Sequence, residues 1–306
     1  MFALSMAALA VAAISLAVPG PHGDLAGTFI DAGKRTPVVL IIPGSGPTDR
    51  DGNNPLGVTA APYRLLADAL AAKGISTLRA DKRGMFGSKA AIPDPNAVTI
   101  GDYAADAHNW ADTLRKRRGA RCVWLLGHSE GGLVALVAGQ EPEGICGLIL
   151  VSAPGRRMSD LIREQLRANP ANAPVLDSAL KAIDSLERGQ RVDVTGMHPA
   201  LQGLFSPRIQ GYLIDMFQRD PTKLAATVRL PVLVVQGERD LQVSTTDAKA
   251  LASANAKAKL ILLPRMNHVL KDVQNDDRAS NLATYADPSL PIDPQLVDAI
   301  ASFVKR

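Results

Sequence analysis

Residues 122–132 read Cys122-Val123-Trp124-Leu125-Leu126-Gly127-His128-Ser129-Glu130-Gly131-Gly132. The apolar run at the start is typical of a buried strand, and a helical pattern extends from Ser129 to Gln140. Between them lies a G-x-S-x-G motif, whose glycines leave room for a sharp turn from strand into helix. Such a turn lifts a serine hydroxyl above the sheet edge and directs the backbone N–H of Glu130 to the same point. The stretch therefore predicts that Ser129 is a nucleophile and that the Glu130 N–H stabilises an oxyanion.

Apolar runs of this kind recur along the chain and alternate with helical patterns. The further runs are Val38–Ile42, Ile75–Leu78, Gly147–Ser152, Val232–Gln236 and Lys259–Leu263, and the further helical patterns are Pro62–Ala72, Ile100–Arg117, Thr245–Ala254 and Pro294–Lys305. Continuously apolar runs indicate strands that helices cover on both faces, so the alternation predicts an α/β fold with a mostly parallel sheet. Residues 25–42 differ, because two strand-like runs around Ala32-Gly33-Lys34 suggest an antiparallel hairpin at the sheet edge.

Residues 155–229 interrupt the alternation. They contain helical patterns at Asp160–Ala168 and Pro174–Leu186, five prolines and no convincing apolar strand. We interpret them as a helical cap, a lid candidate, inserted into a core that residues 24–154 and 230–306 form.

A nucleophilic serine needs a base, and the chain has five histidines. One lies in the leader region, one in the middle of a helix and one in the inserted segment, while His128 adjoins the serine with its side chain turned elsewhere. This leaves His268, in the loop after the run Lys259–Leu263, as the base. Asp240, in the loop after Val232–Gln236, is the preferred acid to orient that histidine, and Glu238 is the alternative. The order serine, acid, histidine is the one expected for this fold.

A second oxyanion donor is expected in the loop Pro43–Asn53, where small residues let the backbone approach a reacting carbonyl closely. We assign it to the N–H of Ser45, with that of Gly46 second. Asp49 and Asp51 in the same loop lack the further oxygens of a calcium site, so we expect a turn or an ion pair with arginine instead. The segment Asp81-Lys82-Arg83-Gly84 is expected to stabilise a turn rather than to touch substrate.

Composition sets the remaining bounds. The 306 residues are 46% hydrophobic and 21% charged, with a net charge of +4, which excludes a disordered chain and demands no nucleic-acid partner. The two cysteines exclude a disulfide scaffold and a cysteine-rich metal site. Cys122 and Cys146 each begin an apolar run, and we favour two buried thiols over a pair.

The N-terminus carries no Asp, Glu, Lys or Arg before residue 24, and residues 2–18 are almost entirely apolar. We interpret residues 1–23 as a signal peptide outside the fold, which predicts export to the periplasm or the medium. The alternatives are an uncleaved membrane anchor and a cytoplasmic protein with a misplaced start codon.

From about Leu25 to its C-terminus, the sequence resembles the α/β-hydrolase superfamily, and most of all bacterial esterases of the serine aminopeptidase-like branch. The motifs that carry this resemblance are Pro43-Gly44-Ser45-Gly46-Pro47-Thr48-Asp49-Arg50-Asp51-Gly52-Asn53, Asp81-Lys82-Arg83-Gly84, Gly127-His128-Ser129-Glu130-Gly131 and Asn267-His268-Val269-Leu270-Lys271. The resemblance implies a triad of Ser129, Asp240 and His268, a helical cap, no cofactor, and carboxylesterase activity on small-molecule esters of short to medium acyl length. The sequence departs from many relatives at Pro43, where they have a histidine.

Three alternatives to an esterase remain at this point. An aminopeptidase would need an acid that holds a free amine, for which Asp160, Glu164 or Glu130 is available. An acyltransferase would transfer the acyl group to an alcohol instead of water, and a non-catalytic binding module would use the scaffold alone. Sequence leaves the acyl and alcohol preference and the oligomeric state open.

Overall fold

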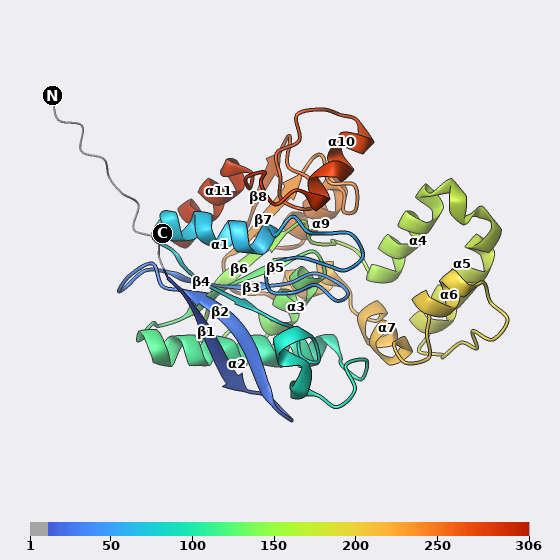
Figure 1. Ribbon diagram of the computed structural model, residues 1–306, viewed down its shortest axis with the longest axis horizontal. Coiled ribbons are helices and arrows are strands. Elements are labelled where there is room, and N and C mark those ends of the chain that lie inside the picture. The colour runs from blue at the N-terminus through green and yellow to red at the C-terminus, as the bar shows by residue number, and fades with distance from the viewer. Residues whose placement is uncertain (1–11, 306) are drawn as a thin grey trace.

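A single twisted sheet runs through the core of the computed structural model, which describes residues 12–305 (Figure 1). Its strands, within the described residues, are β1 (Ala13–Pro19), β2 (Asp24–Ile30), β3 (Val38–Ile42), β4 (Ser76–Ala80), β5 (Val123–His128), β6 (Ile145–Val151), β7 (Val232–Gly237) and β8 (Ala258–Leu263). They lie in the order β1-β2-β4-β3-β5-β6-β7-β8. All pairs from β4 to β8 are parallel, whereas β1 and β2 are antiparallel to their neighbours. The mostly parallel α/β fold is therefore confirmed.

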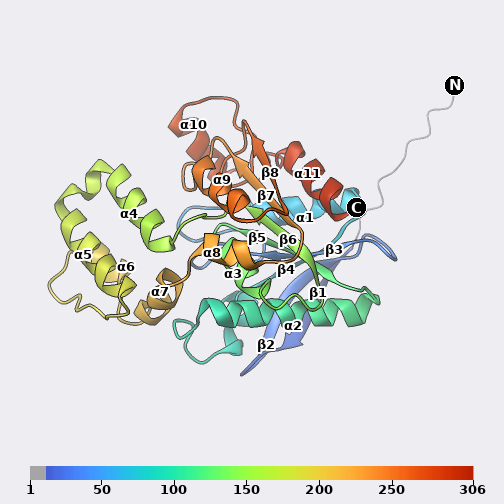
Figure 2. The same cartoon turned by 180° about the vertical axis from the view of Figure 1, so that it is seen from behind.

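Helices cover both faces of the sheet, as Figures 1 and 2 show. One face packs against α1 (Pro62–Ala72) and α11 (Pro294–Val304), and the other packs against α2 (Ile100–Arg118), α3 (Glu130–Ala138) and α9 (Thr245–Ala254). Alternate side chains of β3 point into the two cores: Leu40 joins the α2 and α3 side, and Val39 and Ile41 join the α1 side. Burial on both faces explains why the strand pattern is continuously apolar.

The inserted segment is helical. It contains α4 (Met158–Ala168), the short 3₁₀ helix η2 (Pro170–Val175), α5 (Leu176–Glu187), α6 (Pro199–Leu204), α7 (Gln210–Phe217) and α8 (Pro221–Thr227). In Figure 1, α4 to α7 project to one side of the sheet. The remaining short elements are η1 (Phe86–Ala91), α10 (Arg278–Ala283) and η3 (Thr284–Ala286). That the segment acts as a lid stays a prediction. None of the helices among residues 12–305 has the length and apolar character needed to traverse a bilayer.

The predicted hairpin within residues 25–42 is wrong. β4 lies between β2 and β3, and it pairs antiparallel with β2 and parallel with β3. The antiparallel hairpin at this edge instead joins β1 to β2, with Ala13 opposite Ile30 and Pro19 opposite Asp24. Its turn is closed by the N–H of Gly20, which donates to the carbonyl of Gly23 at 3.0 Å. β2 and β3 follow each other along the chain, but their closeness in sequence does not show that β4 lies between them in the sheet.

The hairpin includes part of the predicted leader, and the assignment of residues 1–23 as a signal peptide stays a prediction. Residues 13–19 form β1 and are paired along their length with β2, so this part of residues 1–23 belongs to the fold. Most of β1 is exposed, but Val18 is buried in the core. An edge strand and the apolar part of a leader have the same composition, which is why the pattern did not separate them. Residues 1–11 of the predicted leader lie outside the described residues.

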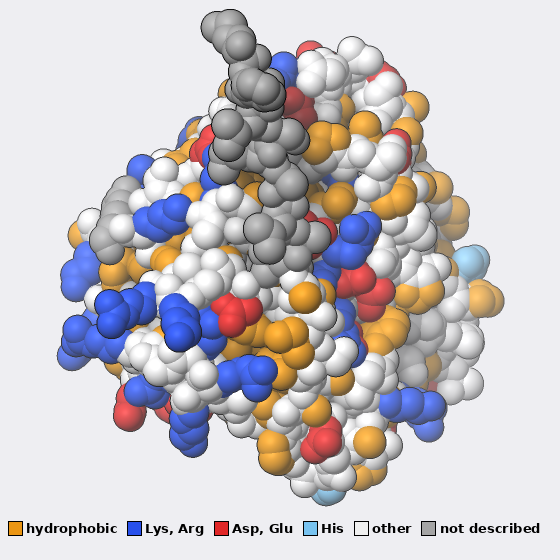
Figure 3. Space-filling model, turned by 60° about the vertical axis from the view of Figure 1, so that its left-hand side comes forward, with side chains coloured by type: hydrophobic (Ala, Val, Ile, Leu, Met, Phe, Trp, Pro, Cys, Tyr) orange, Lys and Arg blue, Asp and Glu red, His pale blue; other side chains and the backbone are white. Residues whose placement is uncertain are grey.

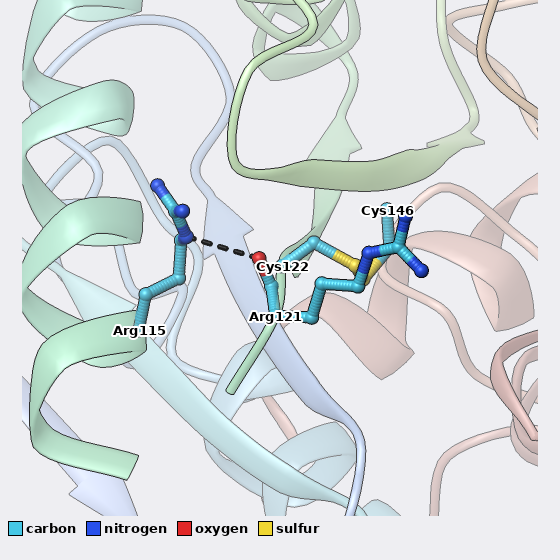
Figure 4. Close-up of a disulfide and its surroundings, with 4 residues drawn as sticks. All are labelled: Arg115, Arg121, Cys122 and Cys146. Carbon is cyan, nitrogen blue, oxygen red and sulfur yellow. Dashed lines mark hydrogen bonds between the residues drawn. A yellow bond between two sulfur atoms is a disulfide. The ribbon is translucent and has the colours of Figure 1, made fainter. Parts of the chain in front are cut away.

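The prediction of two buried thiols is also wrong, because Cys122 and Cys146 form a disulfide (Figure 4). Their Cα atoms are 5.1 Å apart, within the usual range for such a bond. Cys122 directly precedes β5, and a register shift in the β5–β6 pair leaves Cys146 beside it: Val123 pairs with Ile145, but Trp124 pairs with Gly147. An apolar run carries no signal for this irregularity, so the pairing could not be predicted from it. The bond lies at the end of β5 opposite to Ser129.

Candidate active site

Ser129 occupies a strained turn between β5 and α3. Its backbone has φ 53° and ψ −124°, a conformation that residues with a side chain rarely adopt. Two backbone hydrogen bonds hold it: the Ser129 N–H donates to the carbonyl of Val151 at 3.0 Å, and the Gly132 N–H donates to the carbonyl of Ser129 at 2.9 Å. The serine is therefore fixed at the C-terminal end of the central strand.

The glycines of the motif are required by close backbone contacts. A Cβ atom on Gly127 would lie 2.1 Å from the carbonyl oxygen of Gly131, and one on Gly131 would lie 2.3 Å from the carbonyl oxygen of Ile42. Neither distance is compatible with a real carbon atom. The turn therefore needs both glycines, as the motif predicts.

The structure joins Asp240 to His268. The Nδ1 atom of His268 lies 2.9 and 3.0 Å from the two carboxylate oxygens of Asp240. Burial alone would raise the pKa of Asp240. However, the charge and hydrogen bond of His268, together with the N–H groups of Gln242 and Val243, hold this pKa below its usual range. An ionised carboxylate accepts from Nδ1–H, so Nε2 of a neutral His268 is left free to take a proton.

The alternative acid, Glu238, is not in this position. Its side chain is exposed, and it has no hydrogen bond to His268 in the described residues. Asp240 is anchored further by Gln236, whose Nε2 donates to Oδ2 at 3.1 Å. Arg239, the sequence neighbour of Asp240, pairs with Asp276 instead.

Ser129 and His268 line one cavity of about 140 Å³. Gly44, Ser45, Tyr63 and His128 line it as well. The structure records no hydrogen bond between the Ser129 hydroxyl and His268, so it brings the three predicted residues to one site without closing the serine–histidine contact. Such contacts are often long in the free state and shorten when substrate binds. The catalytic roles of the three residues stay predictions.

The predicted oxyanion loop lies against the serine. A Cβ on Gly44 would lie 3.2 Å from Cβ of Ser129, and Ser45 follows in the wall of the cavity. Gly46 is not part of this wall, and its carbonyl accepts the N–H of Thr48 at 2.8 Å. The N–H of Glu130 is the first of α3, where a helix supplies no partner of its own. Ser45 is therefore placed better than Gly46 for the second donor.

Two residues that the sequence analysis passed over complete the site: Tyr63 of α1 and His128. The Tyr63 hydroxyl is 2.8 Å from Nδ1 of His128, and Nε2 of His128 is 2.9 Å from the backbone carbonyl of His268. The side chain of His128 does turn away from the Ser129 hydroxyl, but only to reach the loop of the predicted base. In the sequence, only the position of His128 next to Ser129 indicated that this histidine belongs to the site.

The hydrogen-bond partners determine the tautomer of His128. The His268 carbonyl can only accept, so Nε2 of His128 carries the proton, and Nδ1 accepts from the Tyr63 hydroxyl. The Tyr63 oxygen in turn accepts from the Gly44 N–H at 3.0 Å. Burial, followed by the nearby His268, lowers the pKa of His128 to about 3, so the ring stays neutral near pH 7. One chain of hydrogen bonds thus joins the oxyanion loop to the loop of the base.

The acidic residues of the loop after β3 serve the roles expected of them. Asp49 accepts the N–H groups of Asp51 and Asn53 at 2.9 and 2.8 Å, which closes a turn, and Asp51 pairs with Arg79 at 2.6 Å. Among residues 12–305, no three histidine, cysteine or acidic side chains cluster as metal ligands would.

The segment after β4 stabilises its turn as expected, since Asp81 bonds Arg50 and Arg83 bonds Asp106. Lys82 has a further partner that the sequence did not indicate. Its Nζ donates to the backbone carbonyl of Gly44, in the predicted oxyanion loop, at 2.7 Å.

The chain is similar to known proteins in sequence and in fold. Residues 56–272 match the family described as serine aminopeptidase, S33. The sequence is similar to esterase EstD of Thermotoga maritima, with 26% identity over 243 residues, which are 76% of this chain and 54% of that protein. The chain thus spans about half the length of this curated relative.

The fold is similar to that of two solved esterases. Esterase Pf2001 of Pyrococcus furiosus has a TM-score of 0.58 and 16% identity, over 97% of this chain and 93% of that one. A thermophilic esterase of Thermogutta terrifontis has a TM-score of 0.57 and 19% identity, over 96% of this chain and 98% of that one. The family match extends over most of the chain and includes the Ser129 turn, Asp240 and His268. The protein therefore belongs to the serine aminopeptidase S33 family and has the α/β-hydrolase fold.

Proposed function

We propose that the protein hydrolyses carboxylic esters of small molecules through an acyl-enzyme on Ser129. The observation that carries the proposal is the convergence of the strained Ser129 turn and the His268–Asp240 pair on one cavity. The similarity to esterase EstD supports the same chemistry.

In the proposed mechanism, Nε2 of His268 takes the proton of Ser129, and the serine oxygen attacks the ester carbonyl. The N–H groups of Ser45 and Glu130 stabilise the negative oxygen that forms. His268 then protonates the departing alcohol. Water, deprotonated by the same ring, releases the acid and restores Ser129.

The size and lining of the cavity favour short acyl groups over the medium ones that the family resemblance also allows. A cavity of about 140 Å³ is close in size to cavities that bind one small organic molecule such as benzene. One part of the wall is polar and comprises Thr48, Asn54, Gln242 and Tyr285. We propose acyl chains from acetyl to butyryl, which a series of p-nitrophenyl esters will test by kcat/KM.

An aminopeptidase is disfavoured because the acids that could hold a free amine already have cationic partners. Glu130 lies 3.7 Å from Lys82, Asp160 lies 3.0 Å from Arg163, and Glu164 pairs with Arg156. An aminoacyl p-nitroanilide is therefore expected to be a much poorer substrate than p-nitrophenyl acetate. Product analysis with an added alcohol separates hydrolysis from acyl transfer.

The variant Ser129→Ala tests the proposal. We expect it to lose at least ~10³-fold in kcat on p-nitrophenyl acetate, and to lose labelling by a fluorophosphonate, because no other nucleophile remains at the turn. Ser45→Ala is the matched control: it removes a serine hydroxyl from the same cavity but keeps the backbone N–H, so activity should persist. Hydrolysis by Ser129→Ala at the wild-type rate would overturn the assignment.

We further propose that the protein is exported to an oxidising compartment. The apolar residues 1–12, which precede β1 and include no charged side chain, support export, and so does the Cys122–Cys146 disulfide, since such bonds persist outside reducing compartments. Many Lys and Arg side chains are visible on the face that Figure 3 draws. A groove beside the disulfide is lined by Arg35, Arg118 and Arg121.

Fractionation of cells that express the full chain tests export. We expect the protein in the periplasm or medium, with both cysteines inert to iodoacetamide until a reductant is added. A cytoplasmic protein with two reactive thiols would contradict the proposal.

A further inference from the structure

The peptide group between Gly44 and Ser45 is held from its carbonyl side. Nζ of Lys82 donates to the Gly44 carbonyl at 2.7 Å. This carbonyl belongs to the same peptide group as the Ser45 N–H, the proposed oxyanion donor. In a trans peptide the C=O and N–H bonds point to opposite sides of the chain. A cation that fixes the carbonyl on one side therefore aims the N–H at the other, and Ser45 lines the cavity there.

We infer that Lys82 is a positioning residue, which sets the direction and the donor strength of the Ser45 N–H during ester hydrolysis. This inference rests on the proposed function and adds to it a residue that does not touch substrate. Lys82 is not part of the cavity wall, whereas Gly44, Ser45 and Ser129 are.

The peptide group on the other side of Gly44, between Pro43 and Gly44, is also held. The Gly44 N–H donates to the Tyr63 hydroxyl at 3.0 Å. Gly44 also packs directly on Ser129, where an added Cβ would come within 3.2 Å of the serine Cβ. Tyr63 and Lys82 thus support this loop by side-chain hydrogen bonds to both sides of Gly44.

The surroundings of Lys82 make its charge effective at the carbonyl. The side chain is only 6% exposed, and it faces the carboxylate of Glu130 at 3.7 Å and the ring of Tyr103 at 5.6 Å. With little water nearby, an ammonium group on a carbonyl polarises the peptide strongly and makes its N–H a better donor. The oxyanion thus gains from a positive charge that stays outside the substrate cavity.

Glu130 links the two predicted donors. Its backbone N–H is one of them, and its side chain balances the charge of the lysine that positions the other. Burial lowers the pKa of Lys82, and the adjacent Glu130 carboxylate opposes that change. Removal of only one of these partners would leave a buried charge without a counterion, which is strongly destabilising. An informative variant therefore removes both charges together.

The double variant Lys82→Met/Glu130→Gln tests the inference. With p-nitrophenyl acetate we expect kcat to fall about 10- to 100-fold, less than the loss of a whole oxyanion donor, while KM changes by less than about threefold. The affinity for a trifluoromethyl ketone, which forms an oxyanion on Ser129, should fall by the same factor as kcat. If this variant does not fold, Lys82→Gln/Glu130→Gln takes its place, because its two amides can hydrogen-bond to each other. We expect the same losses in kcat and in ketone affinity.

The matched control is Arg83→Met/Asp106→Asn. It removes the neighbouring ion pair of the same turn, 2.6 Å long, which does not contact the oxyanion loop. Its melting temperature should fall as well, but kcat and ketone affinity should stay near wild type. Equal kcat in the Lys82 variant and wild type, or an equal loss in the control, would overturn the inference. In that case the proposed function would still stand if wild type hydrolyses the ester and Ser129→Ala does not.

Discussion

At the scale of single residues, the candidate site depends on groups whose protonation is set by their surroundings. Asp240 stays ionised because donors surround it, and His128 stays neutral because it is buried beside another imidazole. From the sequence, Asp240 was the preferred acid to orient His268, and Glu238 in the same loop was the alternative. Only the folded loop separates them, since it buries Asp240 against His268 and exposes Glu238.

Replacement of the acid tests this separation. In Asp240→Asn the amide keeps the size of the side chain but no longer stabilises a protonated His268, so we expect kcat to fall ~10⁴-fold with a small change in KM. Glu238→Gln is the control in the same loop and should retain wild-type kcat. The opposite ranking of the two variants would identify Glu238 as the acid. Both are measured on p-nitrophenyl acetate at neutral pH.

At the scale of elements, the turn from β5 into α3 is the most demanding piece of local structure. It combines a serine at positive φ with glycines that contact neighbouring backbone. The glycine spacing made this turn predictable. Helix bounds were predictable for the same local reason: α1 and α9 begin and end at the residues that the periodicity indicated.

A methyl group at Gly131 is expected to damage both stability and activity. Its carbon would lie 2.3 Å from the backbone oxygen of Ile42, so α3 or β3 must shift. We expect Gly131→Ala to lower the free energy of unfolding by about 1–3 kcal/mol, and to lower kcat because the Glu130 N–H moves with the helix. Gly203→Ala, in α6, is the control, because a Cβ there meets nothing within 4 Å. Urea denaturation and kcat measure the effects; a stable, fully active Gly131→Ala would contradict the packing argument.

At the scale of the whole molecule, the parallel sheet assembles the site. The loops after β3, β5, β7 and β8 all leave the C-terminal ends of parallel strands, so they meet at one edge although up to 223 positions, from Ser45 to His268, separate their residues. The disulfide ties β5 and β6 at the opposite end of these strands. The residues of the site thus come from the α/β core, and the inserted helices α4 to α7 lie to one side of the sheet (Figure 1).

Local pattern was sufficient for the α/β class, for most strand and helix positions, and for the residues proposed to react, because periodicity and glycine spacing act over a few neighbouring positions. It was insufficient for the β1–β2 hairpin, the Cys122–Cys146 bond and the contacts of His128 and Lys82. Each of these depends on which distant segment packs alongside and in what register. A nearly uniform apolar strand pattern does not encode that register, so it emerges only when the sheet and its covering helices are assembled.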